Sequence, residues 1–187
     1  MFLLMPNGRQ IRMAQSAAHP ENSPHEMVEE VDRDGHVVRL VTRQQMRQQM
    51  LRHRAVFIAV VSHANELLVH RRSLSKDIWP GWWDVAVGGV MAPGESGLDA
   101  AQRELAEEVG LTGVNVLPLG SGAYEDSNVK LVAESYMCRS DGPFTFSDGE
   151  VTETAWVPLN QVMGWLETHQ VLPDSVALVL PRLPMGL

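Results

Sequence analysis

Cysteine is almost absent from this chain, because Cys138 is the single cysteine among 187 residues. One thiol cannot form an internal disulfide, and no CxxC pair is present to bind a metal ion. Long apolar runs are absent as well: the longest, residues 55–61, is far shorter than the roughly 20 residues that span a bilayer. Residues 2–5 are apolar, but Pro6 follows and no basic residue precedes them, so no secretory signal is expected. These absences favour a cytoplasmic protein without a membrane segment.

An excess of positive charge is also lacking, since the net charge is −8. Residues 1–76 hold 11 basic and 7 acidic residues, whereas residues 77–187 hold 4 and 16. Proteins that bind a nucleic-acid duplex are usually basic, so that class of partner is disfavoured. An acidic half that meets a polyanionic substrate would need divalent cations between the two. Acidic solvated faces are nevertheless common, and the asymmetry alone is a weak signal.

Length and composition fit one globular domain, because 44% of the residues are hydrophobic. Residues 1–24 lack hydrophobic periodicity and end in polar, proline-containing sequence, so we expect a flexible extension there. Residues 25–187 are expected to form the single domain.

The predicted elements alternate between strands and helices. Residues 26–31 and 36–41 flank an Asp-Gly turn and indicate a β-hairpin. Thr42 and Gln45 form a capping-box pattern before a helix over residues 43–51, in which Met46 and Met50 are expected to pack. Further strands are predicted at residues 55–62, 66–72, 84–90, 114–124, 129–138 and 152–157. Helices are predicted at residues 157–168, with Pro158 in the first turn, and at residues 173–183. This order indicates an α/β fold with a mixed sheet between helical layers.

The segment over residues 89–111 carries the strongest chemical signal. After Gly89 come five residues and Glu95, then seven residues and the run R-E-L-A-E-E-V-G-L, which begins at Arg103. On a helix, Glu104, Glu107 and Glu108 fall within roughly 100° of one another, apart from an apolar stripe that can dock on the sheet. That predicted stripe comprises Leu98, Ala101, Leu105 and Val109. Neighbouring carboxylates repel one another, and a hard cation such as Mg²⁺ or Mn²⁺ would relieve the repulsion.

The spacing of Gly89, Glu95 and the run that begins at Arg103 forms a complete Nudix box, and the chain resembles the Nudix superfamily. Nine such matches would arise by accident in a chain of this length about once in ten million. The resemblance implies the Nudix fold and metal-assisted hydrolysis of a diphosphate in a nucleoside-diphosphate-type substrate. It also implies Glu104, Glu107, Glu108 and the Gly89 carbonyl as metal ligands, with Arg103 orienting the carboxylates. A homodimer is suggested by the resemblance alone.

An additional acidic residue outside the box is singled out by its position. Glu150 lies six residues before Trp156, which resembles the place of a further metal ligand or general base in some Nudix hydrolases. Glu153 is a close competitor for that role. Either side chain could equally be a solvated loop carboxylate, because most exposed acids have no catalytic role.

The sequence upstream of the box resembles isopentenyl-diphosphate isomerases and the isomerase-like Nudix hydrolases. The resemblance is carried by residues 53–55, 67–76 and 79–81. It implies that Arg72 and Lys76 hold the diphosphate, and Arg71 is a further candidate. Trp79 and Trp82 could stack on a base or an isoprenoid, or anchor the loop, and Tyr124 has a weaker claim. His53 matches one histidine ligand of the isomerase but is more often a structural residue.

Two residues argue against isomerase chemistry. The isomerase needs a cysteine just before the box and a metal-binding histidine two positions after it, and the aligned residues are Gly88 and Val90. Neither side chain can do that work, and Cys138 lies on a later strand. We therefore predict a hydrolase within an isomerase-like framework. The alternatives are an isopentenyl-diphosphate isomerase and a catalytically silent Nudix-fold module that binds nucleotides or regulates.

Overall fold

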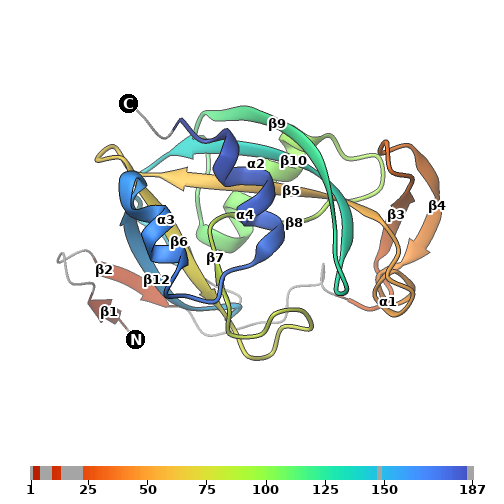
Figure 1. Cartoon of the computed structure of the whole chain (residues 1–187), viewed down its shortest axis with the longest axis horizontal. Helices are drawn as coiled ribbons and strands as arrows, with labels where there is room; N and C mark the ends of the chain where they lie inside the picture. Colours follow the sequence, from red (N-terminus) through yellow and green to blue (C-terminus); the bar gives the residue numbers. More distant parts are fainter. Residues whose placement is uncertain (1, 5–9, 14–22, 147–148, 185–187) are drawn as a thin grey trace.

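The computed structural model describes residues 2–4, 10–13, 23–146 and 149–184. Nine of the described strands form one large mixed sheet (Figure 1). These strands are β3 (Met27–Val31), β4 (Val37–Thr42), β5 (His53–Val61), β6 (Glu66–Arg72), β7 (Trp83–Asp84), β8 (Val87–Val90), β9 (Val116–Glu125), β10 (Lys130–Arg139) and β12 (Val151–Pro158). The main path of the sheet is β12-β6-β5-β10-β9, in which β5 and β10 run parallel and the other neighbours run antiparallel.

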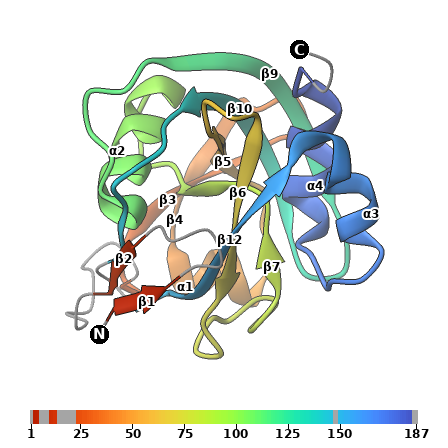
Figure 2. The same ribbon diagram turned by 90° about the vertical axis from the view of Figure 1, so that its left-hand side faces the viewer.

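Helices cover both faces of this sheet, as Figure 2 shows with α2 (Gly97–Val109) on one side and α3 (Val162–Leu166) and α4 (Pro173–Val179) on the other. Strand β5 alternates between the two cores: Val56 and Ile58 pack on the α2 side, whereas Phe57 and Ala59 pack on the α4 side. A fully buried strand that is apolar on both faces is typical of a sheet enclosed by helices. The predicted α/β/α arrangement with a mixed sheet is confirmed.

Helix α2 is delimited by its sequence at both ends. The Ser96 hydroxyl accepts a hydrogen bond from the Asp99 amide at 3.2 Å, and Gly110 ends the helix in the left-handed conformation with φ 70°. Ala101, Leu105 and Val109 of the predicted stripe are buried against the sheet. Leu98 was wrongly included in the stripe, because it is exposed and Ala100 is buried instead.

The hairpin of β3 and β4 is confirmed, and so is the capping box that starts α1 (Arg43–Gln48). Met46 packs with Val28 and Val41, as predicted for a core residue. The same prediction is wrong for Met50, which lies beyond the end of α1 with φ 48° and an exposed side chain. Helix α1 ends earlier than expected, so the four-residue spacing of the two methionines does not place both on one helical face.

Two other predicted elements differ from the structure. The strand predicted over residues 84–90 is divided into β7 and β8, since Trp83 and Asp84 pair with β6 whereas residues 87–90 pair with β5. Pro158 is not in the first turn of a helix but ends strand β12, and a 3₁₀ turn at Leu159–Gln161 precedes α3. A 3₁₀ turn at Leu180–Arg182 likewise continues α4.

A separate three-stranded sheet contains β1 (Phe2–Leu4), β2 (Gln10–Met13) and β11 (Thr145–Phe146). Strand β2 pairs antiparallel with β1 and parallel with β11. The two N-terminal strands lie within the segment predicted as an extension. The division into an extension over residues 1–24 and one domain over residues 25–187 stays a prediction. No helix in the described part of the chain is long and apolar enough to cross a membrane.

Candidate active site

One cleft with an interior volume of about 130 Å³ contains most of the predicted site residues. Glu104, Glu107 and Glu108 of α2 line it, together with Gly89 of β8. Four further residues also line it: Arg72 from β6, Lys76 and Trp79 from the loop after β6, and Glu150, the residue just before β12. Residues that are separated by up to 78 positions in the sequence therefore meet in one place.

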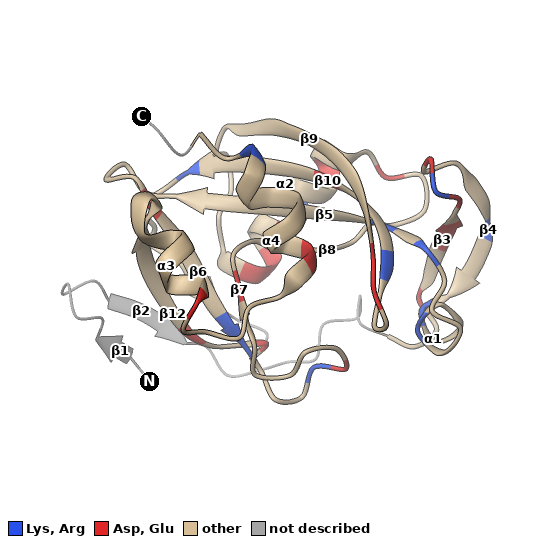
Figure 3. Ribbon diagram, viewed as in Figure 1, with Lys and Arg blue, Asp and Glu red and all other residues tan. Residues whose placement is uncertain are grey.

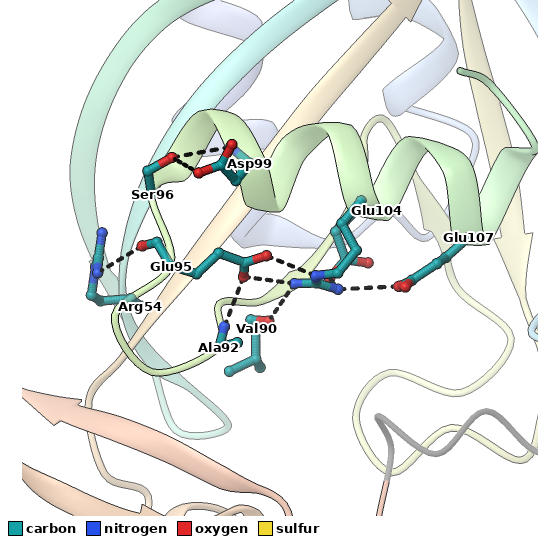
Figure 4. Close-up of polar contacts among 9 residues, drawn as sticks. Arg54, Val90, Ala92, Glu95, Ser96, Asp99, Glu104 and Glu107 are labelled. Carbon is teal, nitrogen blue, oxygen red and sulfur yellow. Dashed lines mark hydrogen bonds and ion pairs between the residues drawn. The ribbon is translucent and has the colours of Figure 1, made fainter. Parts of the chain in front are cut away.

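Arg103 clamps the acids at the end of the box loop (Figure 4). Its Nε and Nη2 donate to the two carboxylate oxygens of Glu95 at 2.9 and 3.0 Å. Its Nη1 donates to Glu104 Oε1 at 2.9 Å and to Glu107 Oε2 at 3.1 Å. A guanidinium with such a planar fork fixes the orientation of several carboxylates at once, and Arg103 itself is not among the residues that line the cleft.

Glu95 is held in its ionised form by this clamp. Burial opposes ionisation, but hydrogen bonds from Arg103 and from the Ala92 amide lower the pKa of the Glu95 carboxyl below its usual value. The loop before α2 is anchored further by Arg54, which donates to the Glu95 carbonyl oxygen and to Glu29 at 3.3 Å each. Glu29 in turn accepts a hydrogen bond from the Gly94 amide at 2.9 Å.

Glycine at position 89 allows the Glu104 carboxylate to approach strand β8. A β-carbon at Gly89 would lie 2.4 Å from Glu104 Oε1, so the Glu104 carboxylate occupies the space that any other side chain would take. The Gly88 amide donates to Glu108 Oε2 at 3.3 Å. Glu104 is buried and Glu107 and Glu108 are half-buried. Clustered carboxylates beside a backbone carbonyl form an all-oxygen donor set, which fits Mg²⁺ or Mn²⁺.

The two candidate acids on β12 and the loop before it have different surroundings. Glu150 forms an ion pair with Lys76, and both side chains line the cleft. Glu153 instead lies 3.6 Å from Arg71, and both of these side chains are about half exposed. Arg71 also donates to the Gly81 carbonyl oxygen at 2.9 Å and is not a lining residue. The alternation along β6 explains this, because Arg72 points into the cleft and Arg71 points to the opposite face.

The predicted aromatic residues divide in the same way. Trp79 lines the cleft. Trp82 does not line it and lies against Trp79, with the two ring centroids 6.4 Å apart. Trp83 packs edge-on against Trp165 at 5.4 Å, which gives it an anchoring role between β7 and α3. Tyr124 is not a lining residue, and its hydroxyl donates to Asp126 at 3.2 Å.

Five polar residues that sequence reasoning did not assign to the site also line the cleft: Glu26, Arg43, Arg47, Asp84 and Asp174. Arg43 and Arg47 are four apart on the helix predicted from the capping box, so their shared face was available as a signal. The carboxyls of Asp84 and Asp174 are both buried. Burial, and next the charge of Asp84, raise the pKa of Asp174 to about 7.

His53 and Cys138, considered above, and a second histidine, His70, are buried and uncharged near neutral pH. Burial, reinforced by the charge of Arg47, lowers the pKa of His53 to about 3, and its Nδ1–H donates to the Leu51 carbonyl oxygen at 3.2 Å. Burial lowers the pKa of His70 to about 4 and raises that of Cys138 to about 12. Cys138 packs in the α2-side core and has no access to the cleft.

A different acidic group lies in the turn of the β3–β4 hairpin. Among the described residues, Asp32, Asp34 and His36 are the set whose potential ligand atoms all lie within 4.8 Å of one another. All three are exposed. The hairpin turn itself explains their proximity, because Asp32 Oδ1 accepts hydrogen bonds from the amides of Asp34 and His36. The box glutamates are held together differently, because Glu104 and Glu107 both accept hydrogen bonds from the Arg103 guanidinium.

Comparison with protein-family models gives a match to the NUDIX domain over residues 51–176. The matched segment includes the whole of the box and every residue from His53 onward that lines the cleft. The chain belongs to the Nudix family. It is 36% identical over 151 residues to the Nudix hydrolase YfcD of Escherichia coli K12, covering 81% of this chain and 83% of YfcD. It is 30% identical over 159 residues to the Nudix hydrolase PA4841 of Pseudomonas aeruginosa, covering 85% and 94% of the two chains.

Solved structures support the same fold. The crystal structure of DR0079 from Deinococcus radiodurans matches this Nudix chain with a TM-score of 0.70 and 24% identity, covering 81% of this chain and 96% of DR0079. The NUDIX domain of Shewanella oneidensis NrtR, solved with ADP ribose, matches with a TM-score of 0.56 and 18% identity, covering 69% and 84%. The chain is thus a Nudix hydrolase, and Nudix hydrolases generally use a divalent metal ion. Its isomerase-like branch stays a resemblance.

Proposed function

We propose that this Nudix chain is an Mg²⁺- or Mn²⁺-dependent pyrophosphohydrolase that cleaves the diphosphate of a small nucleoside-diphosphate-type substrate by water attack on phosphorus. The observation that carries the proposal is the composition of the cleft. The three box glutamates of α2 and the two cations Arg72 and Lys76 line the same space. A diphosphate needs both groups. Cations held by the glutamates would neutralise its charge on the side of attack, and the two basic side chains would hold the diphosphate in place on the other side.

The metal ligands in this proposal are Glu104, Glu107, Glu108 and the Gly89 carbonyl, with Glu150 as a further ligand or general base. Bound there, the cation would polarise phosphate oxygens and lower the pKa of the attacking water. Arg103 positions Glu104 and Glu107 through its hydrogen bonds and does not touch the substrate. Arg103 is therefore a positioning residue, and its removal would misalign two carboxylates together.

Substrate binding is assigned to residues that line the cleft. Arg72 offers a bidentate fork and Lys76 a point charge, and both suit a diphosphate. Trp79 offers an aromatic face for a nucleobase at the same cleft. Arg71 and Trp82, which do not line the cleft, are left out of the proposed contacts. The ADP ribose bound by the Shewanella domain supports a nucleotide-type ligand for this fold but does not identify one here.

The isomerase alternative is disfavoured by geometry in addition to residue identity. A β-carbon at Gly88 would lie 2.0 Å from the Val56 carbonyl oxygen, so a cysteine at this position requires the paired strands β5 and β8 to move. Val90 provides no ligand atom at the second isomerase position. The silent-module alternative is disfavoured because all the box acids are present and oriented.

The test is a product-detecting panel of nucleotide diphosphates and isopentenyl diphosphate, incubated with the purified chain and Mg²⁺ or Mn²⁺. We expect monophosphate products from at least one nucleotide and no double-bond migration in isopentenyl diphosphate. Glu108→Gln should abolish most of the turnover. Glu167→Gln should retain it, because Glu167 is an exposed acid that caps the C-terminal end of α3. Binding without any product across the panel would instead support the silent module, and double-bond migration would support the isomerase.

A further inference from the structure

Helix α1 contributes a second pair of cations to the cleft. Arg43 and Arg47 both line it, and both are half-buried (Figure 3 shows the basic residues of α1). Residues four apart share one face of a helix, and two like charges there repel one another. The helix therefore holds two guanidinium groups together on the side that faces the cleft, which is unfavourable without a compensating negative charge.

Direct ion pairs do not reach all of the cations in the cleft. Glu26 lies 3.2 Å from Arg43 Nη1 and neutralises that residue. Arg47 forms no ion pair or side-chain hydrogen bond with any residue that the structure describes. Arg72 has no carboxylate partner within the described ranges either, and its Nε is buried without a hydrogen-bond partner. Arg47 and Arg72 thus line one cleft without a direct ion pair to any residue that the structure describes.

Arg47 is affected by burial and by charges of both signs. Burial, and next the charge of Arg43, lower the pKa of Arg47 to about 10; the charge of Arg72 acts in the same direction, and those of Asp77 and Asp174 oppose it. Arg47 nevertheless stays charged at neutral pH. An interaction of Arg47 with the helix dipole alone would not require its side chain to line the cleft, since a basic residue in the last turn of a helix can stay in water.

We propose that Arg47, with Arg72 beside it, binds a third phosphate group of the substrate, beyond the diphosphate assigned to Arg72 and Lys76. The inference rests on the proposed function of this cleft. A phosphate suits the site better than a carboxylate, because Arg47 has no carboxylate partner of its own and its guanidinium presents forked donors that match phosphate oxygens. The third phosphate comes either from a longer phosphate chain or from a phosphomonoester elsewhere on the substrate.

The test compares binding of paired probes by calorimetry, with chelator present so that no turnover occurs. ADP and ATP differ by a phosphate in the chain, whereas NADH and NADPH differ by a phosphomonoester. In one of the two pairs, we expect the wild-type chain to bind the probe with the extra phosphate about tenfold or more tightly than the probe without it. The pair that shows the difference identifies the source. Arg47→Gln should remove the preference, and Arg47→Lys should restore part of it.

Arg39→Gln is the matched control, because it removes one positive charge from β4, where Arg39 pairs with Glu30 at 2.6 Å outside the cleft. This variant should keep the preference. Equal affinity of the wild-type chain within both pairs, or a preference that persists in a folded Arg47→Gln variant, would overturn the inference. Thermal melting separates misfolding from lost binding, and Arg47→Lys remains informative if Arg47→Gln does not fold. A preference observed without turnover on any substrate would leave this inference intact and remove the proposed hydrolysis instead.

Discussion

Glycine at position 89 has a chemical consequence at the scale of single residues. The Glu104 carboxylate lies where a side chain at this position would be, so the shape of the metal site depends on a missing β-carbon. We predict that Gly89→Ala displaces Glu104 and lowers kcat by about 10- to 100-fold, in line with the effect of disturbing residues that orient a metal site. The fold should persist, because the clash is with the end of a flexible side chain.

A matched glycine substitution provides the control for that variant. Gly164 of α3 has no heavy atom within 4 Å of an added β-carbon, so Gly164→Ala should leave kcat unchanged and raise the melting temperature slightly. Steady-state kinetics with thermal melting measure both effects. An active Gly89→Ala enzyme would show that Glu104 does not need its observed position.

Asp174 predicts how stability depends on pH. Burial and the charge of Asp84 raise its pKa to about 7 from an unfolded value of 3.8, so the folded chain binds the proton more tightly between about pH 4 and pH 7. The stability that comes from this proton is fully present below pH 4 and is lost as the pH rises through 7. Each unit of pKa difference contributes about 1.4 kcal/mol at most.

Asp174→Asn tests this assignment because asparagine does not ionise. The free energy of unfolding of the variant, relative to wild type, should rise by about 1–4 kcal/mol between pH 4.5 and pH 8. His53 and His70 act in the opposite direction, since their lowered pKa values destabilise the fold in acid, but both chains share them and the difference cancels. Urea unfolding at several pH values measures the difference. A constant difference would mean that Asp174 is ionised throughout.

At the scale of elements, helix α2 is the part that the sequence specifies best. Its first and last residues follow from a capping serine and a left-handed glycine, and its buried face follows from 3.6-residue periodicity. We predict that Ser96→Ala destabilises the fold by about 1 kcal/mol through loss of the hydrogen bond to the Asp99 amide, and thermal or urea unfolding measures it. Unchanged stability would mean that water replaces the serine hydroxyl at no cost.

Other elements could not be predicted as well, for physical reasons that local sequence does not contain. Residues 84–90 form a continuous apolar run, but tertiary pairing divides it, because its two ends bond to different strands. Pro158 suits the first turn of a helix, yet antiparallel pairing with Glu66 keeps it in β12. Met50 fits helical spacing, but α1 ends before it. In the first two cases contacts distant in sequence override the local pattern.

At the scale of the whole molecule, the box glutamates of the cleft were predictable from the sequence, whereas its basic residues were predictable only in part. Glu104, Glu107 and Glu108 share one helix and a known spacing, so their convergence needs no tertiary information. Arg47 reaches the same cleft only because β3 pairs with β5 and carries the hairpin and α1 beside it. That arrangement depends on contacts that the sequence pattern does not reveal, among them the pairing of Glu30 with His53 and the ion pair of Glu29 with Arg54.

The central claim is that the box carboxylates of this cleft catalyse metal-dependent hydrolysis of a diphosphate. Its most direct test is the ratio of initial rates for wild type and Glu108→Gln on the first active substrate of the panel, with Mg²⁺ and with chelator. We predict that the substitution lowers the rate by about 100-fold or more, that chelator abolishes the wild-type rate, and that Glu167→Gln matches wild type. Equal rates for wild type and a folded Glu108→Gln enzyme would contradict the proposed site.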